Sequence, residues 1–300
     1  MQATKTFLGA ISAFIKAKTY DYYLLVKFRL TFIVVFSSLI TYAIASGSNF
    51  SYESLIMLFL GGFLITGAAN ALNQVFEKDV DKLMVRTANR PLAQERMMPT
   101  EAILAAGLFG LTGVSLLWYW FNDLTAIIGA LSLITYSFIY TPLKRISSVA
   151  VFVGAIPGAL PPMIGWVAAT GQITIEAYII TAIQFLWQFP HFWAIAWVAH
   201  EDYSRAGFKL MPSSGGRDRF SATQIVLYTI SLIPVSVLLF FKGNITPVAT
   251  IIIAISGLIF LYYGIKLWKS CDTNDAKKVM FASFIYLPVV LSALLLGGKF

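Results

Sequence analysis

The chain has 300 residues, of which 58% are hydrophobic and only 12% are charged, about half the charged share of a typical soluble domain. Its formal net charge is +8, and it contains one cysteine, Cys271. This composition excludes a large soluble domain, an internal disulfide framework and a cysteine-based metal cluster. The basic surplus is expected to orient membrane helices, and no nucleic-acid partner is predicted.

Apolar segments recur along the whole chain, and each is long enough to cross a bilayer as a helix. Residues 1–21 carry scattered lysines and no clear cleavage site, so a short amphipathic cytoplasmic lead-in is predicted there. Nine membrane-spanning helices are predicted after it, over residues 28–46, 52–76, 101–120, 122–140, 148–168, 175–199, 221–241, 245–265 and 278–297. The predicted fold class is an all-α polytopic membrane protein, with residues 1–300 in a single transmembrane domain.

The basic residues distinguish the two ends of these predicted helices. All of them fall on one side except Lys242 and Lys299. Because cytoplasmic loops carry the excess of lysine and arginine, the N-terminus is predicted to be cytoplasmic, in a multi-pass protein of the cell (inner) membrane. The opposite loops resemble simple turns. Any chemistry is therefore expected at the cytoplasmic side, in the long, mixed-charge loops 77–100 and 200–220.

The first of these loops follows an acidic motif, NQVFEKDVD, in which Asn73, Glu77 and Asp81 are spaced by four residues. On a helix these side chains share one face. An amide and two carboxylates are oxygen ligands for a hard cation, and Mg²⁺ is the natural choice because phosphate and water can complete its coordination. In the alternative interpretation, the two acids are solvated at a helix end and pair with Lys78 and Lys82.

Basic residues suited to phosphate follow the acidic motif. Arg86 and Arg90 lie in RTANRPL, and guanidinium groups bind phosphate oxygens in a bidentate fork. Lys144 and Arg145 close the fourth predicted span, and Lys27 opens the first. Each of these could reach a diphosphate or simply anchor its helix at the membrane surface, and for Lys27 the anchoring role is favoured.

The second loop, HEDYSRAGFKLMPSSGGRDRF, repeats this composition. Glu201 and Asp202 stand at the end of the sixth predicted span, and Arg205 and Lys209 follow in the loop. The two loops are predicted to face each other across a central cavity that opens to the cytoplasmic side. There they would bind two metal ions and a diphosphate between them.

The sixth predicted span contains His191 in FLWQFPHFWAIAW. A histidine inside a membrane helix is expected to face the bundle interior, where it could bind a metalloporphyrin iron, orient an acceptor, or hydrogen-bond to a neighbouring helix. The aromatic residues around it could pack against lipid, or line a pocket that stabilises a carbocation. Residues 154–166, GAIPGALPPMIGW, predict a broken helix that lines a cavity.

These motifs together resemble a known family. NQVFEKDVDKLMVRTANRPL is similar to the first acidic motif of the UbiA-type intramembrane prenyltransferases. RTANRPL, YTPLKR, GAIPGALPPMIGW, PHFW and DYSRAGFKLMP resemble the branch that farnesylates protohaem IX. The resemblance runs from about residue 22 to the ninth predicted span. It implies that Asn73, Glu77 and Asp81 bind Mg²⁺ and diphosphate, with Glu201 and Asp202 as a second cluster.

The reaction implied by this resemblance is transfer of a farnesyl group from farnesyl diphosphate to a vinyl group of haem b, which gives haem o. Membrane lipid and a haem a synthase or terminal-oxidase assembly are the further partners that the family implies. The alternatives are a quinone-precursor or chlorophyll-type acceptor and, in a different class, a transporter of an anionic substrate. Transporters place ionisable residues near the bilayer midplane, whereas the acids here gather at one face.

Overall fold

A computed structural model describes residues 2–300, together with the side chains of residue 9 and residues 11–300. Met1 and the side chain of Lys5, which belong to the predicted lead-in, lie outside the described part. Regular secondary structure within it is helical, apart from a single antiparallel bridge between Ile245 and Gly298. The all-α prediction is therefore confirmed for the described residues.

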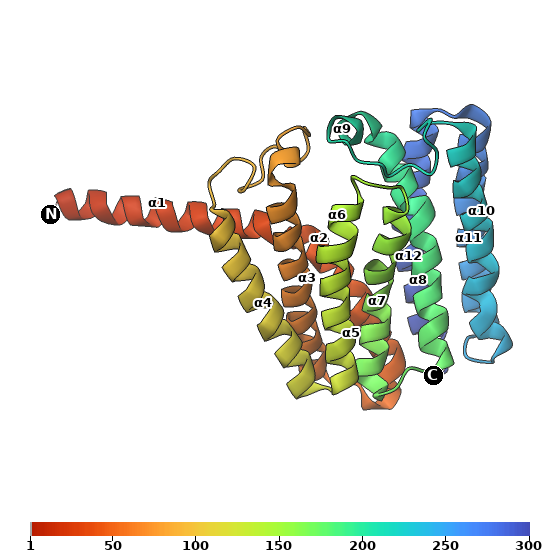
Figure 1. Cartoon of the computed structure of the whole chain (residues 1–300). Coiled ribbons are helices and arrows are strands. Elements are labelled where there is room, and N and C mark those ends of the chain that lie inside the picture. Colours follow the sequence, from red (N-terminus) through yellow and green to blue (C-terminus); the bar gives the residue numbers. More distant parts are fainter. Residues whose placement is uncertain (1) are drawn as a thin grey trace.

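The long helices pack side by side as one bundle, and α1 projects sideways from it (Figure 1). The helices and helical turns are α1 (Gln2–Leu25), α2 (Phe28–Ser46), η1 (Gly47–Asn49), α3 (Tyr52–Asp81), α4 (Pro99–Trp120), α5 (Asp123–Ile134), the π-helical turn η2 (Thr135–Tyr140), α6 (Thr141–Leu143), α7 (Ala150–Thr170), α8 (Ile175–Val198), α9 (His200–Arg205), α10 (Arg219–Phe241), α11 (Pro247–Ser270) and α12 (Thr273–Gly297).

Eight segments of the described chain are long and apolar enough to cross a membrane, which makes this an integral membrane protein. They are α2 with η1, α3, α4, the continuous run from α5 to α6, α7, α10, α11 and α12. Helix α8 has 24 residues, but Gln184, Gln188, Pro190 and His191 lower its mean hydropathy. It is the one predicted span that this criterion does not include.

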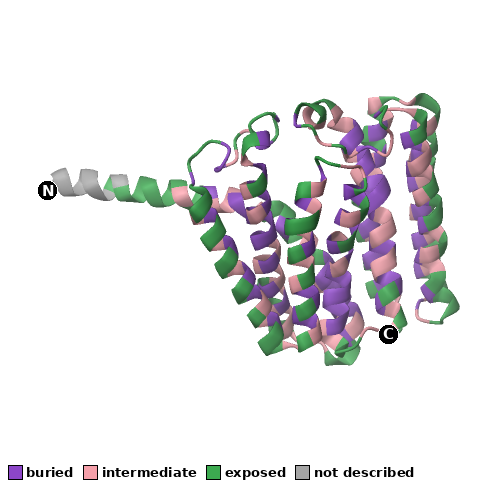
Figure 2. Ribbon diagram, in the orientation of Figure 1, coloured by how far each residue is buried: buried purple, intermediate pink, exposed green. Residues whose placement is uncertain are grey.

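Buried residues line the inside of the bundle, and exposed residues cover its outer face (Figure 2). Small residues permit the closest helix contacts, as expected in membrane bundles. A Cβ added at Gly61 of α3 would lie 3.3 Å from the carbonyl oxygen of Gly113 in α4. A Cβ added at Gly113 would lie 2.9 Å from the carbonyl oxygen of Gly61. On the other side of the bundle, Gly165 of α7 packs directly on the backbone of Ser38 in α2.

Helix α7 continues through its prolines, so the prediction of a broken helix at 154–166 is wrong. A proline has no N–H for the carbonyl four residues earlier, and two prolines therefore free the carbonyls of Pro157 and Gly158. Ser132 Oγ donates to the first (3.2 Å), and Gln184 Nε2 donates to the second (2.8 Å). Because neighbouring helices supply these donors, the helix stays intact. Its predicted place beside a cavity is confirmed.

Candidate active site

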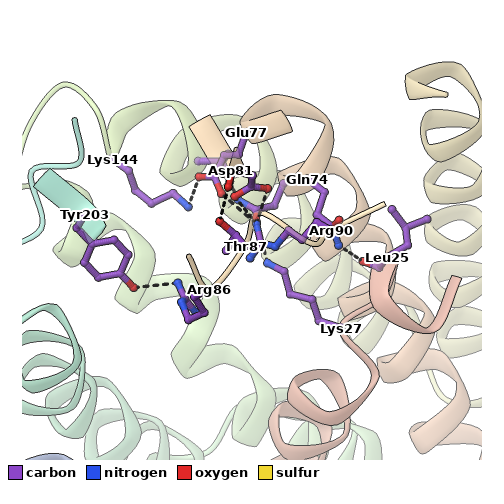
Figure 3. A network of polar contacts seen from close by, with 12 residues as sticks. Leu25, Lys27, Gln74, Glu77, Asp81, Arg86, Thr87, Arg90, Lys144 and Tyr203 are labelled. Atoms are coloured by element: carbon purple, nitrogen blue, oxygen red, sulfur yellow. Dashed lines mark hydrogen bonds and ion pairs between the residues drawn. The ribbon is translucent and has the colours of Figure 1, made fainter. Parts of the chain in front are cut away.

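The acidic motif forms a buried ladder at the end of α3. Asn73, Glu77 and Asp81 have exposed fractions of 1%, 5% and 0%. The helix extends five residues beyond the predicted end at 76, so all three side chains follow one helix face as the spacing predicted. The Glu77 and Asp81 side chains point into a shared polar network (Figure 3), and Asn73 joins it through its hydrogen bond with Lys27.

Each member of this ladder contacts a basic side chain from a different part of the chain. Lys27 Nζ donates to Asn73 Oδ1 (2.8 Å), and Lys144 forms an ion pair with Glu77. Arg90 Nη1 contacts both carboxylate oxygens of Asp81 at 2.7 Å and lies 3.9 Å from Glu77 Oε2. The site therefore combines two buried carboxylates with three basic side chains, the mixture that a metal-bound diphosphate requires.

Lys27 reaches this network because α3 fixes the turn between α1 and α2. Lys27 itself adopts a left-handed backbone conformation (φ +47°), which is uncommon for a residue with a side chain. Gln74 Nε2 donates to the backbone carbonyls of Leu24 (2.9 Å) and Leu25 (2.8 Å) at the end of α1. Burial, and next the nearby Arg90, lower the pKa of Lys27 well below its usual range. Lys27 thus lies in the network, and its favoured role as a membrane anchor stays a prediction.

Arg90 is placed by the loop between α3 and α4. Thr87 Oγ1 donates to the backbone carbonyl of Asp81 (2.9 Å), which folds the loop back over the end of α3. Further along, Arg96 Nε pairs with Asp21 at 2.9 Å and ties the loop to α1. These contacts bring Arg90 over the acidic ladder, although nine residues separate it from Asp81.

The neighbouring lysines do not pair with the motif acids. Lys78 pairs with Asp79 (3.2 Å), and Lys82 pairs with Glu95 (2.7 Å), all on the exposed side of the helix end and loop. The alternative interpretation of a solvated helix end paired with these lysines is therefore wrong.

The acids of the second loop make local contacts. Asp202 pairs with Arg205 one turn later on α9, and the exposed Glu201 lies 3.3 Å from Arg217 Nη1. No group of three or more His, Cys, Asp or Glu side chains in the described chain is close enough to hold a metal ion. The structure thus does not bring Glu201 and Asp202 together with the α3 ladder, and their metal-binding role stays a prediction.

The two loops nevertheless meet. Arg86 Nη2 donates to the hydroxyl of Tyr203 (3.2 Å), as Figure 3 shows, and the backbone N–H of Lys209 donates to the carbonyl of Lys144 (2.9 Å). The side chains of Lys209 and Arg145 are exposed. Of the predicted diphosphate ligands, Arg90 and Lys144 therefore lie in the network, Arg86 lies at its edge, and Arg145, Arg205 and Lys209 lie outside it.

A cavity of about 360 Å³ adjoins the network inside the bundle. Residues of α2, α3, α5, η2, α7, α8 and α12 line it, and most of the lining side chains are apolar. Asn70, one turn before Asn73, and Tyr140, one turn before Lys144, belong to both the cavity wall and the surroundings of the network. The buried ladder therefore lies at one end of a largely apolar chamber.

Tyr136 and Tyr140 are site residues that the sequence prediction missed. Their rings lie 5.3 Å apart on the π-helical turn η2, and Lys144 Nζ lies 4.8 Å above the Tyr140 ring. Thr141 Oγ1 closes the turn by donating to the carbonyl of Tyr136 (2.9 Å), and it accepts from Asn73 Nδ2 (3.3 Å). Such turns recur at functional sites. The YTPLKR motif includes Tyr140 and Thr141, but a π-helical turn has no hydrophobic period by which the sequence could predict it.

His191 lies in the cavity wall and is buried. Its Nδ1 is 2.8 Å from Ser283 Oγ on α12, so the predicted hydrogen bond to a neighbouring helix is confirmed. The ring of Trp187 stacks on the imidazole with centroids 4.4 Å apart. His191 thus has one nitrogen engaged by protein, and its ring borders the chamber.

The residues of the ladder fit a magnesium–diphosphate complex. Asn73, Glu77 and Asp81 offer only oxygen atoms of the kind that Mg²⁺ prefers, buried on one helix face. Lys27, Arg90 and Lys144 provide donors for phosphate oxygens in the same place.

Comparison with known proteins agrees with this geometry. The profile of the UbiA prenyltransferase family matches residues 34–287. A protoheme IX farnesyltransferase of Cytophaga hutchinsonii is 45% identical over 275 residues, which cover 92% of this chain and 96% of the relative. One from Flavobacterium psychrophilum is 45% identical over 283 residues, which cover 92% and 93%.

Solved structures share the fold at low sequence identity. A digeranylgeranylglyceryl phosphate synthase has a TM-score of 0.79 at 18% identity, covering 94% of this chain and 98% of that one. A UbiA homologue from Archaeoglobus fulgidus bound to GPP and Mg²⁺ has a TM-score of 0.74 at 15% identity, covering 91% and 99%.

Proposed function

The chain belongs to the UbiA prenyltransferase family, and we propose that it transfers a farnesyl group from farnesyl diphosphate to a vinyl group of haem b, giving haem o. Relatives named for this activity match over nearly the whole chain. The structural observation that carries the proposal is the buried ladder of Asn73, Glu77 and Asp81, surrounded by three basic side chains at the end of an apolar chamber.

The ladder would hold the diphosphate end of the substrate. Magnesium bound by Asn73, Glu77 and Asp81 would supply positive charge to the leaving diphosphate. Arg90 and Lys144 now contact the carboxylates, and they would turn to the phosphate oxygens when the substrate enters. Preformed cations of this kind stabilise charge as it develops, because they need little reorganisation during the reaction.

The chamber would hold the isoprenoid and keep water from the reacting carbon. Breaking the allylic C–O bond leaves its electron pair on diphosphate and a cation on the farnesyl group. Tyr136 and Tyr140 lie between Lys144 and the apolar wall, where their ring faces would stabilise that cation. The vinyl group supplies the electrons of the new C–C bond. A water molecule then adds to the resulting cation and loses a proton, which completes the hydroxyethylfarnesyl side chain.

In the membrane, α8 would form the ninth span. Its 24 residues cover about 36 Å at 1.5 Å per residue, which is enough for a bilayer. Its polar side chains face the chamber rather than lipid, which removes the main cost of their insertion. With nine spans, the distribution of basic residues would support a cytoplasmic N-terminus, with the ladder at the cytoplasmic side of the cell membrane. Asp202 would then complete the site when the loops close over the diphosphate.

Incubation of the purified protein with labelled farnesyl diphosphate, Mg²⁺ and haem b tests the proposal. Label should appear in haem o, identified by its mass. Parallel reactions with an aromatic quinone precursor or a chlorophyll-type macrocycle should give no prenylated product. If the label appears in the quinone precursor and not in haem o, the acceptor is the quinone precursor instead of haem b. Absence of any product, together with uptake of diphosphate by proteoliposomes, would favour the transporter.

A further inference from the structure

The hydroxyl of Ser283 on α12 makes two short contacts. Its Oγ donates to the backbone carbonyl of Met280 (2.6 Å), and it lies 2.8 Å from His191 Nδ1. A hydroxyl has one proton, and a carbonyl oxygen can only accept. Both contacts are hydrogen bonds only when Ser283 donates its proton to Met280 and accepts a hydrogen bond from His191 Nδ1.

This contact assigns the tautomer of the imidazole. Since Nδ1 carries the hydrogen, the neutral ring has its free electron pair on Nε2. Within the described residues no group hydrogen-bonds to Nε2 of His191, and the residue forms part of the cavity wall. The ring thus presents an electron-pair donor to the chamber.

The surrounding side chains fix the plane of the ring as well. Trp187 stacks on His191 at an interplanar angle of 18°, and Phe284 meets it edge-on with centroids 5.1 Å apart. The indole N–H of Trp187 donates to the backbone carbonyl of Ser283 (2.8 Å). One short segment of α12 therefore orients both the imidazole and the aromatic ring that covers it.

The face of α8 that lines the cavity also lacks free hydrogen-bond donors. Gln184 Nε2 donates to the carbonyl of Gly158 (2.8 Å), and Gln188 Nε2 donates to that of Ala155 (3.1 Å). The two side-chain carbonyl oxygens of these glutamines are buried without a hydrogen-bond partner in the described part of the chain.

We infer that His191 binds the haem iron through Nε2, and that Ser283 is the positioning residue that selects this tautomer. The inference rests on the proposed function, since it names how the acceptor is held. Iron lies at the centre of the porphyrin and the vinyl groups lie at its edge. Ligation from α8 would fix the plane of the macrocycle and present a vinyl group toward the end of the chamber where the ladder lies. Residues that orient a ligating histidine commonly change metal affinity about 10–100-fold when removed.

Spectroscopic titration with ferric haem tests the inference without turnover. Wild-type protein should give the Soret band of an imidazole-ligated haem. His191→Ala should lack that band and regain it when free imidazole is added. Ser283→Ala should weaken haem binding about 10–100-fold. Ser283→Thr keeps the hydroxyl and should restore wild-type affinity.

Ser236→Ala is the matched control. Ser236 is also buried, and it also donates to a carbonyl of its own helix, that of Leu232 (2.7 Å), but it contacts Tyr286 rather than a histidine. It should bind haem as the wild type does. Identical spectra of wild type and His191→Ala, or equal affinities of Ser283→Ala and Ser283→Thr, would overturn the inference. Formation of haem o despite such a result would leave the proposed function standing, whereas its absence from the wild-type reaction would reject the function itself.

Discussion

Replacing Gly165 by alanine should force α2 and α7 apart. The added Cβ would lie 2.8 Å from the carbonyl carbon of Ser38 and 3.0 Å from its Cα, and closer still to its oxygen. Carbon atoms pack best at about 3.5–4.0 Å, so the backbones must separate by roughly 1 Å. Overpacking of this kind costs about 1–3 kcal/mol, and the upper end applies here because neither backbone can rotate away.

Gly107→Ala is the control for the intrinsic helix preference of alanine. Gly107 lies on the exposed face of α4, and an added Cβ meets nothing within 4 Å. Both substitutions gain about 1 kcal/mol of helix propensity, so their difference isolates the packing cost. A difference of about 3 kcal/mol corresponds to roughly 6–12 °C in melting temperature for a chain of this size.

Tryptophan fluorescence during heating of the two detergent-solubilised variants, at one scan rate, measures this difference. Gly165→Ala should melt well below Gly107→Ala. Equal melting temperatures would show that the α2–α7 contact is looser than the structure has it.

Three further changes test the site. Arg90→Lys keeps the charge but loses the planar guanidinium, whose Nη1 contacts both oxygens of Asp81. We expect kcat/KM to fall about 10–100-fold, and an unchanged value would show that the charge alone suffices. Lys27→Met should raise KM for farnesyl diphosphate with only a small loss of melting temperature. An unchanged KM would show that Lys27 has a structural role. Gly158→Ala would place a Cβ where the side-chain oxygen of Gln188 lies, one turn before His191 on α8. Haem affinity should therefore fall, and an unchanged haem affinity would contradict the placement of haem against α8.

The helices were predictable from sequence because apolar runs of bilayer length are nearly unambiguous. Predicted and observed ends differ by at most five residues. Two differences from the prediction depend on contacts with other segments of the chain. Helix α3 continues past 76 because the polar residues of its last turn find buried partners, and α7 survives its prolines because Ser132 and Gln184 occupy the freed carbonyls. Neither partner is visible in the segment itself.

Some residues of the candidate site were predictable from the sequence and others were not. Asn73, Glu77 and Asp81 were predictable because their spacing is a property of one helix. The contact of Lys27 with the ladder was not predictable because its partner lies 46 residues away, on α3. Ser283 gave no signal at all, since a serine in an apolar span is common and its contact with His191 depends on how α12 packs on α8. Contacts between helices are set by packing, which composition and periodicity do not encode.

The central claim is that the buried carboxylates of α3 hold a metal-bound diphosphate for prenyl transfer. Comparing haem o formation by Asp81→Asn and Asp79→Asn tests it most directly. The two acids lie on the same helix turn, but the Asp81 side chain is 1% exposed and that of Asp79 is 76% exposed. The account predicts a loss of about 10²–10³-fold in kcat/KM for Asp81→Asn and wild-type turnover for Asp79→Asn. Wild-type turnover by a folded Asp81→Asn protein at saturating Mg²⁺ would contradict it.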